Sequence, residues 1–493
     1  MKIQNLLYLM LLAAPAVYAQ SGRQIESWIT TNDRANLFTK QEKAIVFQDK
    51  VGGKSGVPII VDDRQQYQEI DGFGFALTGG SAEHLIKMSA PARDKILREM
   101  FAYDGNNVGF SYLRLTIGAS DMNSFVFSYN DLPEGETDYE LKKFSLSQDL
   151  KDVVPVMKEI LAINPNIRIM ASPWSAPAWM KEHFNVRGGK LRKECYAVYA
   201  RYFVKYIQAM EKQGIHLDAI TFQNEPLNSR NTPSMPWSPA DQTEFVRDHL
   251  GPAFRQAGIQ TKIIVFDHNT DRPDYPLTIF SDPEAAQYVD GAAFHNYVGE
   301  MSAMSLVHNA RPDKNLYFTE QMTTDRGDDD HISIVPAVKR TIIDVMRNWS
   351  RNSILWNLAA DPNFDPHTDN GGCSMCQGAI TIDGDEVMWR NVAYYTVAHA
   401  SKFVRPGSVR IASTNRGDQS LGMYEDEQNP GVFRTVPIAQ ADVLPNVAFR
   451  TPEGKVVLIV VNDTWLTRTF TVQHNGAYAR LTLPAGACGT YVW

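Results

Sequence analysis

The chain alternates short apolar runs with amphipathic helical patterns, and it does so eight times between residues 69 and 360. Each run has strand length and is rich in β-branched and aromatic residues, which is typical of a buried strand. Helical candidates with apolar residues three and four apart lie between the runs, at 89–102, 145–163 and 195–213 among others. Eight strand–helix units predict a (β/α)8 TIM barrel, an α/β fold. The runs are 69–77, 110–118, 167–174, 217–225, 261–269, 291–297, 315–320 and 353–360.

The N-terminus has the order of an export signal. Lys2 precedes an apolar core at 6–17, and small residues at Val17 and Ala19 suit cleavage after Ala19. No cysteine follows this cut and no later segment is long and apolar enough to span a membrane, so we expect no stable membrane anchor. The chain is therefore expected to be exported, to the periplasm or the exterior of a bacterial cell. The alternative is an ordinary buried N-terminal helix.

After about residue 400 the chain shows short strand patterns separated by turn signals and no long helices. This pattern predicts an all-β sandwich attached to the barrel. Extended stretches at 43–49 and 57–63 suit strands of the same sandwich. We therefore predict four parts: a signal peptide (1–19), an N-terminal segment that contributes to the sandwich (20–65), the barrel (66–399) and a C-terminal β-sandwich (400–493).

The net charge is −8 and the pI about 5.8, without any basic run or basic helical stripe. Nucleic acid is therefore not expected as a partner. The predicted strands instead end in polar or aromatic side chains at the edge where barrels carry their active sites. The alternative is that each such residue only marks the exit of a strand into solvent. These residues are Arg114, Trp174, Glu225, Asp267, His295, Tyr297, Glu320 and Trp356.

Two glutamates stand out among these strand ends. Glu225 ends the fourth run and Glu320 the seventh, so their side chains can converge over the barrel mouth. A pair of carboxyl groups on either side of a sugar fits glycoside hydrolysis, one as acid and one as nucleophile or base. Aromatic rings at the same edge (Trp174, Trp179 and Tyr297 among them) can stack on sugar faces. The alternative is two glutamates in salt bridges with Arg or Lys of the rim.

The chain resembles glycoside hydrolase family 30, the glucosylceramidase-like retaining hydrolases, from about residue 65 to its end. The resemblance implies that Glu225 is the general acid/base, Glu320 the nucleophile, and Asn224 a contact of the sugar 2-hydroxyl. It also implies that Arg114, Trp174, His295, Tyr297 and Trp356 bind substrate, and that no metal or organic cofactor is needed. The stretches that carry it are 72–78, 109–121, 171–181, 201–207, 222–226, 282–297, 317–321, 356–359 and 399–408.

The expected substrate is a β-linked glucoside, oligosaccharide or polysaccharide, either a glucosylceramide-like β-glucoside or a β-1,6-glucan. Two departures from the family pattern bear on the sugar: Gly79 stands where an aspartate that contacts hydroxyls is expected, and Asn296 replaces an aromatic residue. A β-xylosidase or deoxy-hexosidase of the same mechanism is therefore an alternative. A non-catalytic carbohydrate-binding protein is an alternative of another class.

The remaining motifs follow strand ends. Cys373 and Cys376 are expected to form a local disulfide, with a zinc site shared with His367 and Asp369 as the alternative. Asp267 and its neighbour His268 are interpreted as support for the catalytic pair. The acidic run 325–331 is expected to be a solvated loop, with calcium binding as the alternative.

Overall fold

A computed structural model describes residues 22–50, 58–325, 330–415, 419–425, 433–439 and 443–493. The expected signal peptide (1–19) and most of the acidic run at 325–331 lie outside the described residues. Within the described residues, no helix has the length and apolar character needed to cross a membrane.

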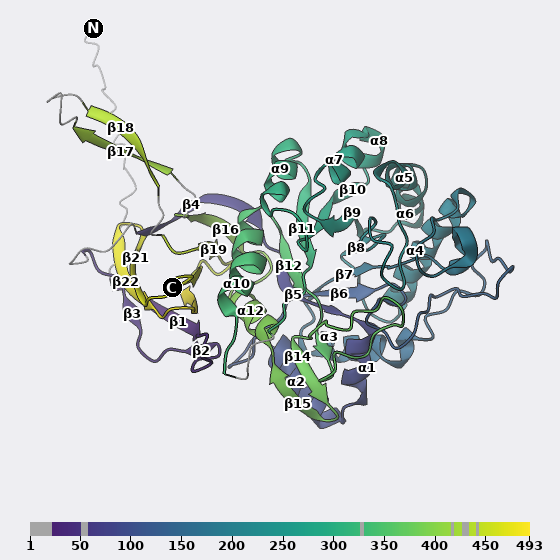
Figure 1. Ribbon diagram of the computed structural model, residues 1–493, viewed down its shortest axis with the longest axis horizontal. Helices are drawn as coiled ribbons and strands as arrows, with labels where there is room; N and C mark the ends of the chain where they lie inside the picture. The colour runs from purple at the N-terminus through teal and green to yellow at the C-terminus, as the bar shows by residue number, and fades with distance from the viewer. Residues whose placement is uncertain (1–21, 51–57, 326–329, 416–418, 426–432, 440–442) are drawn as a thin grey trace, which may run out of the picture.

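Eight parallel strands form the predicted barrel (Figure 1). The strands pair in sequence order from β5 to β11, and β12 pairs with β5 on the other side. Parallel bridges from Leu316 to Ser350 and from Met322 to Trp356 join β11 to the segment around β12 and close the circle. The strands are β5 (Gly72–Leu77), β6 (Tyr112–Thr116), β7 (Arg168–Ser172), β8 (Ala219–Thr221), β9 (Lys262–Asn269), β10 (Val289–His295), β11 (Asn315–Glu320) and β12 (Asn352–Leu355).

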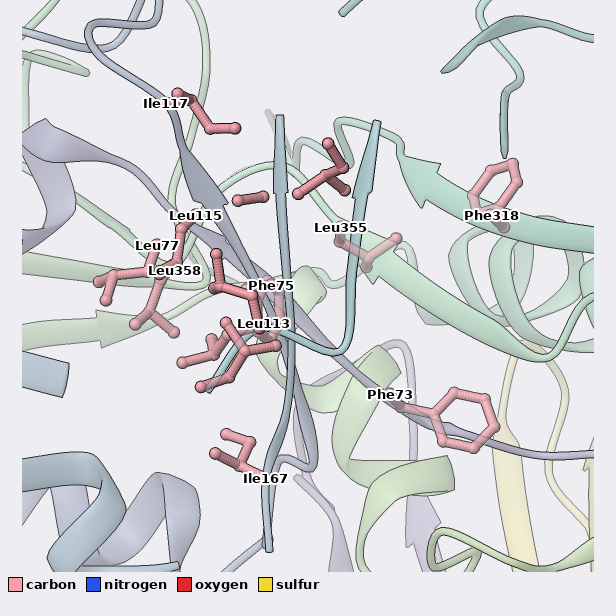
Figure 2. Close-up of a cluster of buried hydrophobic side chains, with 14 of the residues drawn as sticks. Phe73, Phe75, Leu77, Leu113, Leu115, Ile117, Ile167, Phe318, Leu355 and Leu358 are labelled. Carbon is pink, nitrogen blue, oxygen red and sulfur yellow. The ribbon is translucent and has the colours of Figure 1, made fainter. Parts of the chain in front are cut away.

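Helices cover the outside of the barrel because alternate strand residues point outward and are apolar. Figure 2 shows this layer, which includes Phe75, Leu113, Leu115, Phe318 and Leu355. Two of the covering helices contain a π turn, η5 (Val246–Leu250) between α5 and α6 and η6 (Lys339–Asp344) between α10 and α11. The helices are α1 (Gly79–Lys87), α2 (Ala90–Phe101), α3 (Val153–Ile163), α4 (Tyr196–Lys212), α5 (Pro239–Phe245), α6 (Gly251–Ala257), α7 (Asp274–Ser281), α8 (Pro283–Ala286), α9 (Ser302–Ala310), α10 (Ile334–Val338), α11 (Val345–Arg347) and α12 (Val392–Ser401).

A second, mostly antiparallel sheet of ten strands makes up the β-sandwich, in the order β2-β1-β23-β20-β19-β16-β4-β21-β22 with β3 beside β1. It combines strands from both ends of the chain, because β1 pairs with β23 and β4 with β16. Its strands are β1 (Gln24–Thr30), β2 (Thr39–Lys40), β3 (Ile45–Val46), β4 (Ile59–Glu69), β16 (Val409–Ser413), β19 (Asn446–Arg450), β20 (Val456–Val461), β21 (Arg468–His474), β22 (Ala477–Leu483) and β23 (Cys488–Val492).

Strand β20 explains how the sandwich attaches to the barrel. Its sequence VVLIVV is apolar at every position, and the whole strand is buried. Val456, Leu458 and Val460 face the interior of the sandwich, whereas the alternate residues belong to the same hydrophobic core as the barrel helices. A strand that is buried on both faces needs apolar residues without alternation, which is what the sequence contains.

Three shorter elements complete the described structure. The strands β13 (Ala359–Ala360), β14 (Ile380–Asp383) and β15 (Glu386–Arg390) form a small sheet after the barrel. A hairpin of β17 (Gln419–Glu425) and β18 (Phe433–Ala439) projects from the sandwich side in Figure 1. Short 3-10 turns lie in the loops, including η1 (Asp149–Lys151) before α3.

Candidate active site

The interior of the barrel changes from apolar to polar within one layer of side chains. An apolar layer fills its middle, with one residue from each of seven strands: Tyr112, Met170, Ala219, Ile264, Ala293, Tyr317 and Ile354. Because strand side chains alternate, the residue two positions further along each strand points inward one layer higher. On five of the strands that residue is polar and buried: Arg114, Ser172, Thr221, His295 and Thr319.

Asp267, at the end of β9, connects this polar layer. Its carboxylate accepts five hydrogen bonds from five other strands and is fully buried. Burial alone favours the neutral acid, but the positive charge of Arg114 and the hydrogen bond from His295 outweigh it, so the pKa of Asp267 is far below its ordinary range. The donors are Thr319 Oγ1 (2.5 Å), Thr221 Oγ1 (2.6 Å), Ser172 Oγ (2.8 Å), Arg114 Nη2 (2.8 Å) and His295 Nε2 (3.1 Å).

Two irregularities in strand pairing produce this convergence. Between β9 and β10, Ala293 pairs with Phe266 but Phe294 pairs with His268, so Asp267 is an extra residue in its strand. It has a φ of 63°, in the left-handed region, as bulged residues often do. Between β10 and β11 the register also shifts, and Thr319 is the extra residue there. The two extra residues hydrogen-bond each other, and the bulge in β9 turns the side chain of Asp267 to the barrel centre.

Arg114 connects Asp267 to the predicted nucleophile. Its Nη1 donates to Glu320 Oε2 at 2.7 Å, and its Nη2 also donates to Asn224 Oδ1 at 2.8 Å. The guanidinium lies 4.9 Å above the ring of Trp174, a cation–π distance. Arg114 therefore orients the side chains of Glu320, Asn224 and Asp267 at the barrel mouth. Trp174 covers one face of its guanidinium group.

Glu225 lies beyond the end of β8, in a left-handed conformation with a φ of 45°. Its backbone N–H donates to the carbonyl oxygen of Asp267 at 3.0 Å. The Oε1 atom lies 3.1 Å from Nδ1 of His295, and Oε2 accepts a 2.7 Å hydrogen bond from Asn228 Nδ2. His268 Nε2 lies 3.9 Å from Glu225 Oε1. Because Nδ1 of His268 accepts a hydrogen bond from the backbone N–H of Leu227, its Nε2 atom carries the proton.

The two glutamates face each other closely. One carboxylate oxygen of Glu225, one of Glu320 and a ring nitrogen of His295 all lie within 4.8 Å of one another. Tyr297 Oη donates to Glu320 Oε1 at 3.0 Å. Carboxyl groups about 5–5.5 Å apart belong to retaining glycosidases, whereas inverting enzymes need roughly 6.5–9.5 Å to hold a water molecule. Among the described residues this is also the cluster with ligand atoms close enough for one metal ion.

His295 controls the protonation of this cluster. Burial lowers its pKa, but Glu320, Asp267 and Glu225 surround it and raise the value to about 9. Asp267 accepts from Nε2, so the second proton of the ring lies on the line between Nδ1 and Glu225. Burial raises the pKa of Glu225, but the hydrogen bond and charge of His295 reverse the shift and lower it to about 2. The pair therefore keeps one shared proton at neutral pH.

Glu320 titrates in the opposite direction. Burial raises its pKa above the ordinary glutamate value, and the nearby Glu225 adds to the increase. The charges of His295 and Arg114 oppose this increase without cancelling it. Glu320 therefore loses its proton at a higher pH than an ordinary glutamate does, and at that pH the Glu225–His295 pair still holds its proton.

A pocket of about 730 Å³ opens above the pair. Four of the predicted site residues line it: Glu225, Glu320, Tyr297 and Trp356. The other four are almost completely buried and lie behind the carboxylates: Arg114, Asn224, Trp174 and His295. Trp174 packs against Trp356 with ring centroids 5.2 Å apart, so Trp356 lines the pocket and Trp174 supports it from behind. Trp179 lies elsewhere, with its indole N–H on Asn130.

Asp121 is a pocket residue that the sequence analysis did not single out. It follows β6 by five residues, lines the pocket and is almost buried. Burial, and then the nearby Glu320 and Glu225, raise its pKa well above the ordinary value. The sequence does place this acidic residue shortly after a strand, but Asp121 lies beyond the predicted strand at 110–118.

Gly79 does not leave the gap in the pocket that the sequence suggested. It is the first residue of α1 and is buried. A Cβ atom there would approach Asn123 Nδ2 to 1.9 Å, so a side chain at this position would collide with Asn123. Gly79 does not line the pocket, whereas Asp121 does and supplies a carboxyl group to it. Asn296 is occupied as well, since its amide donates to Thr270 Oγ1 and to the carbonyl oxygen of Gly299.

The predicted local disulfide between Cys373 and Cys376 is confirmed. The two sulfur atoms are bonded to each other and so do not form a zinc site with His367 and Asp369. Both cysteines line the pocket.

Comparison with known proteins gives consistent matches along the chain. Residues 70–404 match the model of the glycosyl hydrolase family 30 TIM-barrel domain, and residues 407–491 match that of the family 30 beta sandwich domain. The endo-1,6-beta-D-glucanase neg1 of Aspergillus fumigatus is 34% identical over 411 residues, which cover 78% of this chain and 82% of the relative. The lysosomal acid glucosylceramidase of Mus musculus is 25% identical over 466 residues, with 89% and 84% covered.

A solved structure agrees with these matches. The endo-beta1,6-glucanase BT3312 superposes with a TM-score of 0.81 at 32% identity and covers 95% of this chain and 99% of its own.

Proposed function

Because the chain belongs to glycosyl hydrolase family 30 and is thus a retaining glycoside hydrolase, we propose that it cleaves β-1,6-linked glucan, with Glu320 as nucleophile and Glu225 as general acid/base. The observation that carries the proposed mechanism is the close approach of the two carboxylates, which have oxygens within 4.8 Å of each other beside Nδ1 of His295. This spacing suits attack on the anomeric carbon by one group while the other protonates the leaving oxygen.

The first step joins Glu320 to the sugar. A carboxylate oxygen of Glu320 attacks the anomeric carbon, and the bond from that carbon to the leaving oxygen breaks. Glu225 delivers the proton that it shares with His295, so the leaving group departs as an alcohol. Arg114 and Tyr297 each bind one oxygen of Glu320, which aims the carboxylate, and the charge of Arg114 favours its ionised form.

The second step releases the sugar. Glu225 takes a proton from water, the water oxygen bonds to the anomeric carbon, and the ester bond to Glu320 breaks. Two inversions at the same carbon give overall retention of the β configuration. Asn224, fixed by Arg114, is placed to bind the sugar 2-hydroxyl, a contact that gains strength in the transition state.

The wall on the side of Glu225 favours a carbohydrate leaving group over a lipid. This wall contacts the leaving group, because Glu225 protonates the glycosidic oxygen that departs with it. Polar side chains dominate it, and they can bind hydroxyl groups, whereas ceramide chains would need a broad apolar surface. These side chains are Asn228, Ser229, Arg230, Asn231, His268, Asn269 and Asp271. Two relatives that match the chain well are endo-1,6-β-glucanases, which supports the same substrate.

The other sugars considered from the sequence have less support. The reason to consider a β-xylosidase or deoxy-hexosidase was Gly79, but Gly79 does not line the pocket, and Asp121 supplies a carboxyl group to it. A non-catalytic carbohydrate-binding protein would not need a buried, proton-sharing carboxylate pair.

Product analysis on a substrate panel tests the proposal. The enzyme is incubated with β-1,6-glucan, β-1,3-glucan, β-xylan and glucosylceramide, and the products are separated and followed by NMR from the first turnover. We expect oligosaccharides from β-1,6-glucan, with the β-anomer formed first. Glucose release from glucosylceramide without cleavage of the glucan would contradict the substrate, and an α-anomer as first product would contradict the mechanism.

A further inference from the structure

His268, the last residue but one of β9, brings an open hydrogen-bond donor to the pocket. It lines the pocket and is only 7% exposed. Burial lowers the pKa of its imidazole, so the ring is neutral at neutral pH. Its Nδ1 atom accepts from the backbone N–H of Leu227 at 3.3 Å, which leaves the single proton on Nε2. Within the described part of the chain Nε2 makes no hydrogen bond, since Glu225 Oε1 is too far away at 3.9 Å.

A donor as buried as Nε2 of His268 is expected to have an acceptor, because an unpaired polar group in the interior costs free energy. The neighbouring carboxylate does not need this proton. Glu225 Oε1 already faces Nδ1 of His295, and its Oε2 accepts from Asn228. The N–H group of His268 is therefore available to a molecule that enters the pocket beside Glu225.

Asn269, the next residue of β9, is arranged in the same way. Its Oδ1 atom accepts from the backbone N–H of Tyr297 at 2.9 Å, which fixes the orientation of the amide and leaves Nδ2 as the donor. Asn269 lines the pocket too. Both side chains thus use their acceptor atom on a backbone N–H and keep N–H groups for the pocket. Two adjacent donors suit a sugar, whose neighbouring hydroxyl oxygens each accept hydrogen bonds.

The contacts of His268 place it at the leaving-group end of the site. Leu227, which holds its ring, and Asn228, which holds Glu225, are consecutive residues of the loop after β8. These two hydrogen bonds keep the imidazole and the carboxylate side by side. In the proposed mechanism Glu225 protonates the oxygen that departs. The sugar that carries this oxygen therefore lies next to Nε2 of His268.

We propose that His268 makes the enzyme specific for a sugar as leaving group, by donating from Nε2 to a hydroxyl group of the departing glucose unit, with Asn269 as a second donor. The inference rests on the proposed function, because it requires a glucan, in which the leaving group is itself a glucose. His268 transfers no proton in this role. Its contact matters when a sugar departs, and not when the leaving group has no hydroxyl groups of its own.

The test replaces His268 by two amides, each of which reproduces one ring nitrogen. Asparagine places an oxygen near the position of Nδ1 and can still accept from Leu227, but it does not reach the position of Nε2. Glutamine places an N–H group near Nε2 and lacks the acceptor. Both variants are assayed on a β-1,6-linked glucose tetrasaccharide and on phenyl β-gentiobioside. The phenol of the second substrate still needs the proton of Glu225 but carries no sugar hydroxyl.

We expect kcat/KM of His268→Asn to fall about tenfold on the tetrasaccharide, the value of one hydrogen bond, and less than about twofold on the phenyl glycoside. His268→Gln should lose less than His268→Asn on the tetrasaccharide, because it keeps a donor. His249→Asn, at a histidine of η5 that does not line the pocket, should change neither value. An equal fall on both substrates, no fall in His268→Asn, or a larger loss in His268→Gln would mean that His268 only supports Glu225 and its loop, and would overturn the proposal.

Transfer to an added sugar gives a second measurement, which does not depend on the amount of active enzyme. A sugar bound at the leaving-group position can replace water in the second step, because this transfer is the reverse of the first step. With phenyl β-gentiobioside as donor and methyl β-glucoside as acceptor, NMR gives the ratio of transfer to hydrolysis. We expect this ratio to fall about tenfold in His268→Asn, and an unchanged ratio would overturn the proposal. Failure of the wild type to cleave either the tetrasaccharide or β-1,6-glucan would instead overturn the proposed function.

Discussion

The polar layer inside the barrel and the loop wall above it are built in opposite ways. Arg114, Asp267 and His295 come from strands, have no exposed surface and connect to one another through the carboxylate of Asp267. The wall consists of the loop after β8, which contains Leu227, and the loop between β13 and β14, which contains Met375. These two side chains are 43% and 42% exposed. Loops tolerate change better than strands that are paired on both sides. The layer can therefore keep one chemistry while the wall adapts to different substrates.

This comparison predicts which substitutions affect chemistry and which affect substrate choice. Changes in the polar layer should lower kcat on every substrate, because all of them react at the same carboxylates. Changes in the wall should act on one substrate more than on another. The largest effects are expected at the catalytic pair and the smallest at Asn228, where the polar layer meets the wall.

The largest effects are expected from the pair itself. Glu320→Gly should lower kcat by at least about 10⁴-fold, because no covalent intermediate can form. Glu225→Ala should cost roughly 10²–10⁴-fold, the contribution of general acid–base catalysis. Added azide separates the two roles. Glu225→Ala should regain rate and form a β-glycosyl azide, since azide attacks the covalent intermediate. Glu320→Gly should give the α-azide, since azide then replaces the nucleophile. The reverse pattern would show that the two roles are exchanged.

The next effect is expected at the centre of the polar layer. Asp267→Asn removes the charge that balances Arg114 and offers an N–H group to five donors. We expect a fall in kcat of about 10²-fold or more on all substrates, because Arg114 and His295 lose their fixed positions. Kinetics on glucan and aryl glucoside measure this effect. Melting temperature should fall too, since the partner charge stays buried.

Asp149 provides the matched control for this substitution. It is also buried, but its carboxyl group lies outside the barrel mouth, with one hydrogen bond from Tyr129. Burial raises its pKa to about 7, so the carboxyl group is already partly neutral at neutral pH. Asp149→Asn should therefore leave kcat unchanged. Equal losses in the two variants would mean that Asp267 contributes only to folding.

Much of the fold and the catalytic pair could be predicted because they depend on local patterns. Eight apolar runs with polar ends indicated both the barrel and the edge at which Glu225 and Glu320 meet. The role of Asp267 at the centre of the polar layer could not be predicted, because it depends on two bulges that shift the register by one residue. Asp121 was missed because it enters the pocket from a loop, where no periodic pattern indicates direction. The apparent gap at Gly79 depended on Asn123, a contact that only the folded chain creates.

The pH profile of kcat/KM reports the ionisation of Glu320, Glu225 and His295 in the free enzyme. The active form has Glu320 ionised and one proton shared by Glu225 and His295. As pH falls, Glu320 becomes protonated, and its raised pKa places this acidic limb above the ordinary glutamate range. As pH rises, the pair loses its proton, and the pKa of about 9 at His295 places the basic limb there.

The smallest predicted effect lies where wall and layer meet. Asn228 belongs to the loop after β8, yet its amide donates to Glu225 Oε2 at 2.7 Å and so stabilises the ionised carboxylate. Asn228→Ala removes this stabilisation, so the proton affinity of the Glu225–His295 pair increases. The basic limb of the profile should move to higher pH by about 1–2 units, the value of one hydrogen bond to a charged group. The acidic limb should stay in place, because Asn228 does not contact Glu320. Asn231→Ala, in the same loop without a bond to Glu225, should leave the basic limb unchanged. A shift in both variants, or a shift to lower pH, would mean that the loop acts on the site through solvent exposure, and that wall and layer are less separate than their construction indicates.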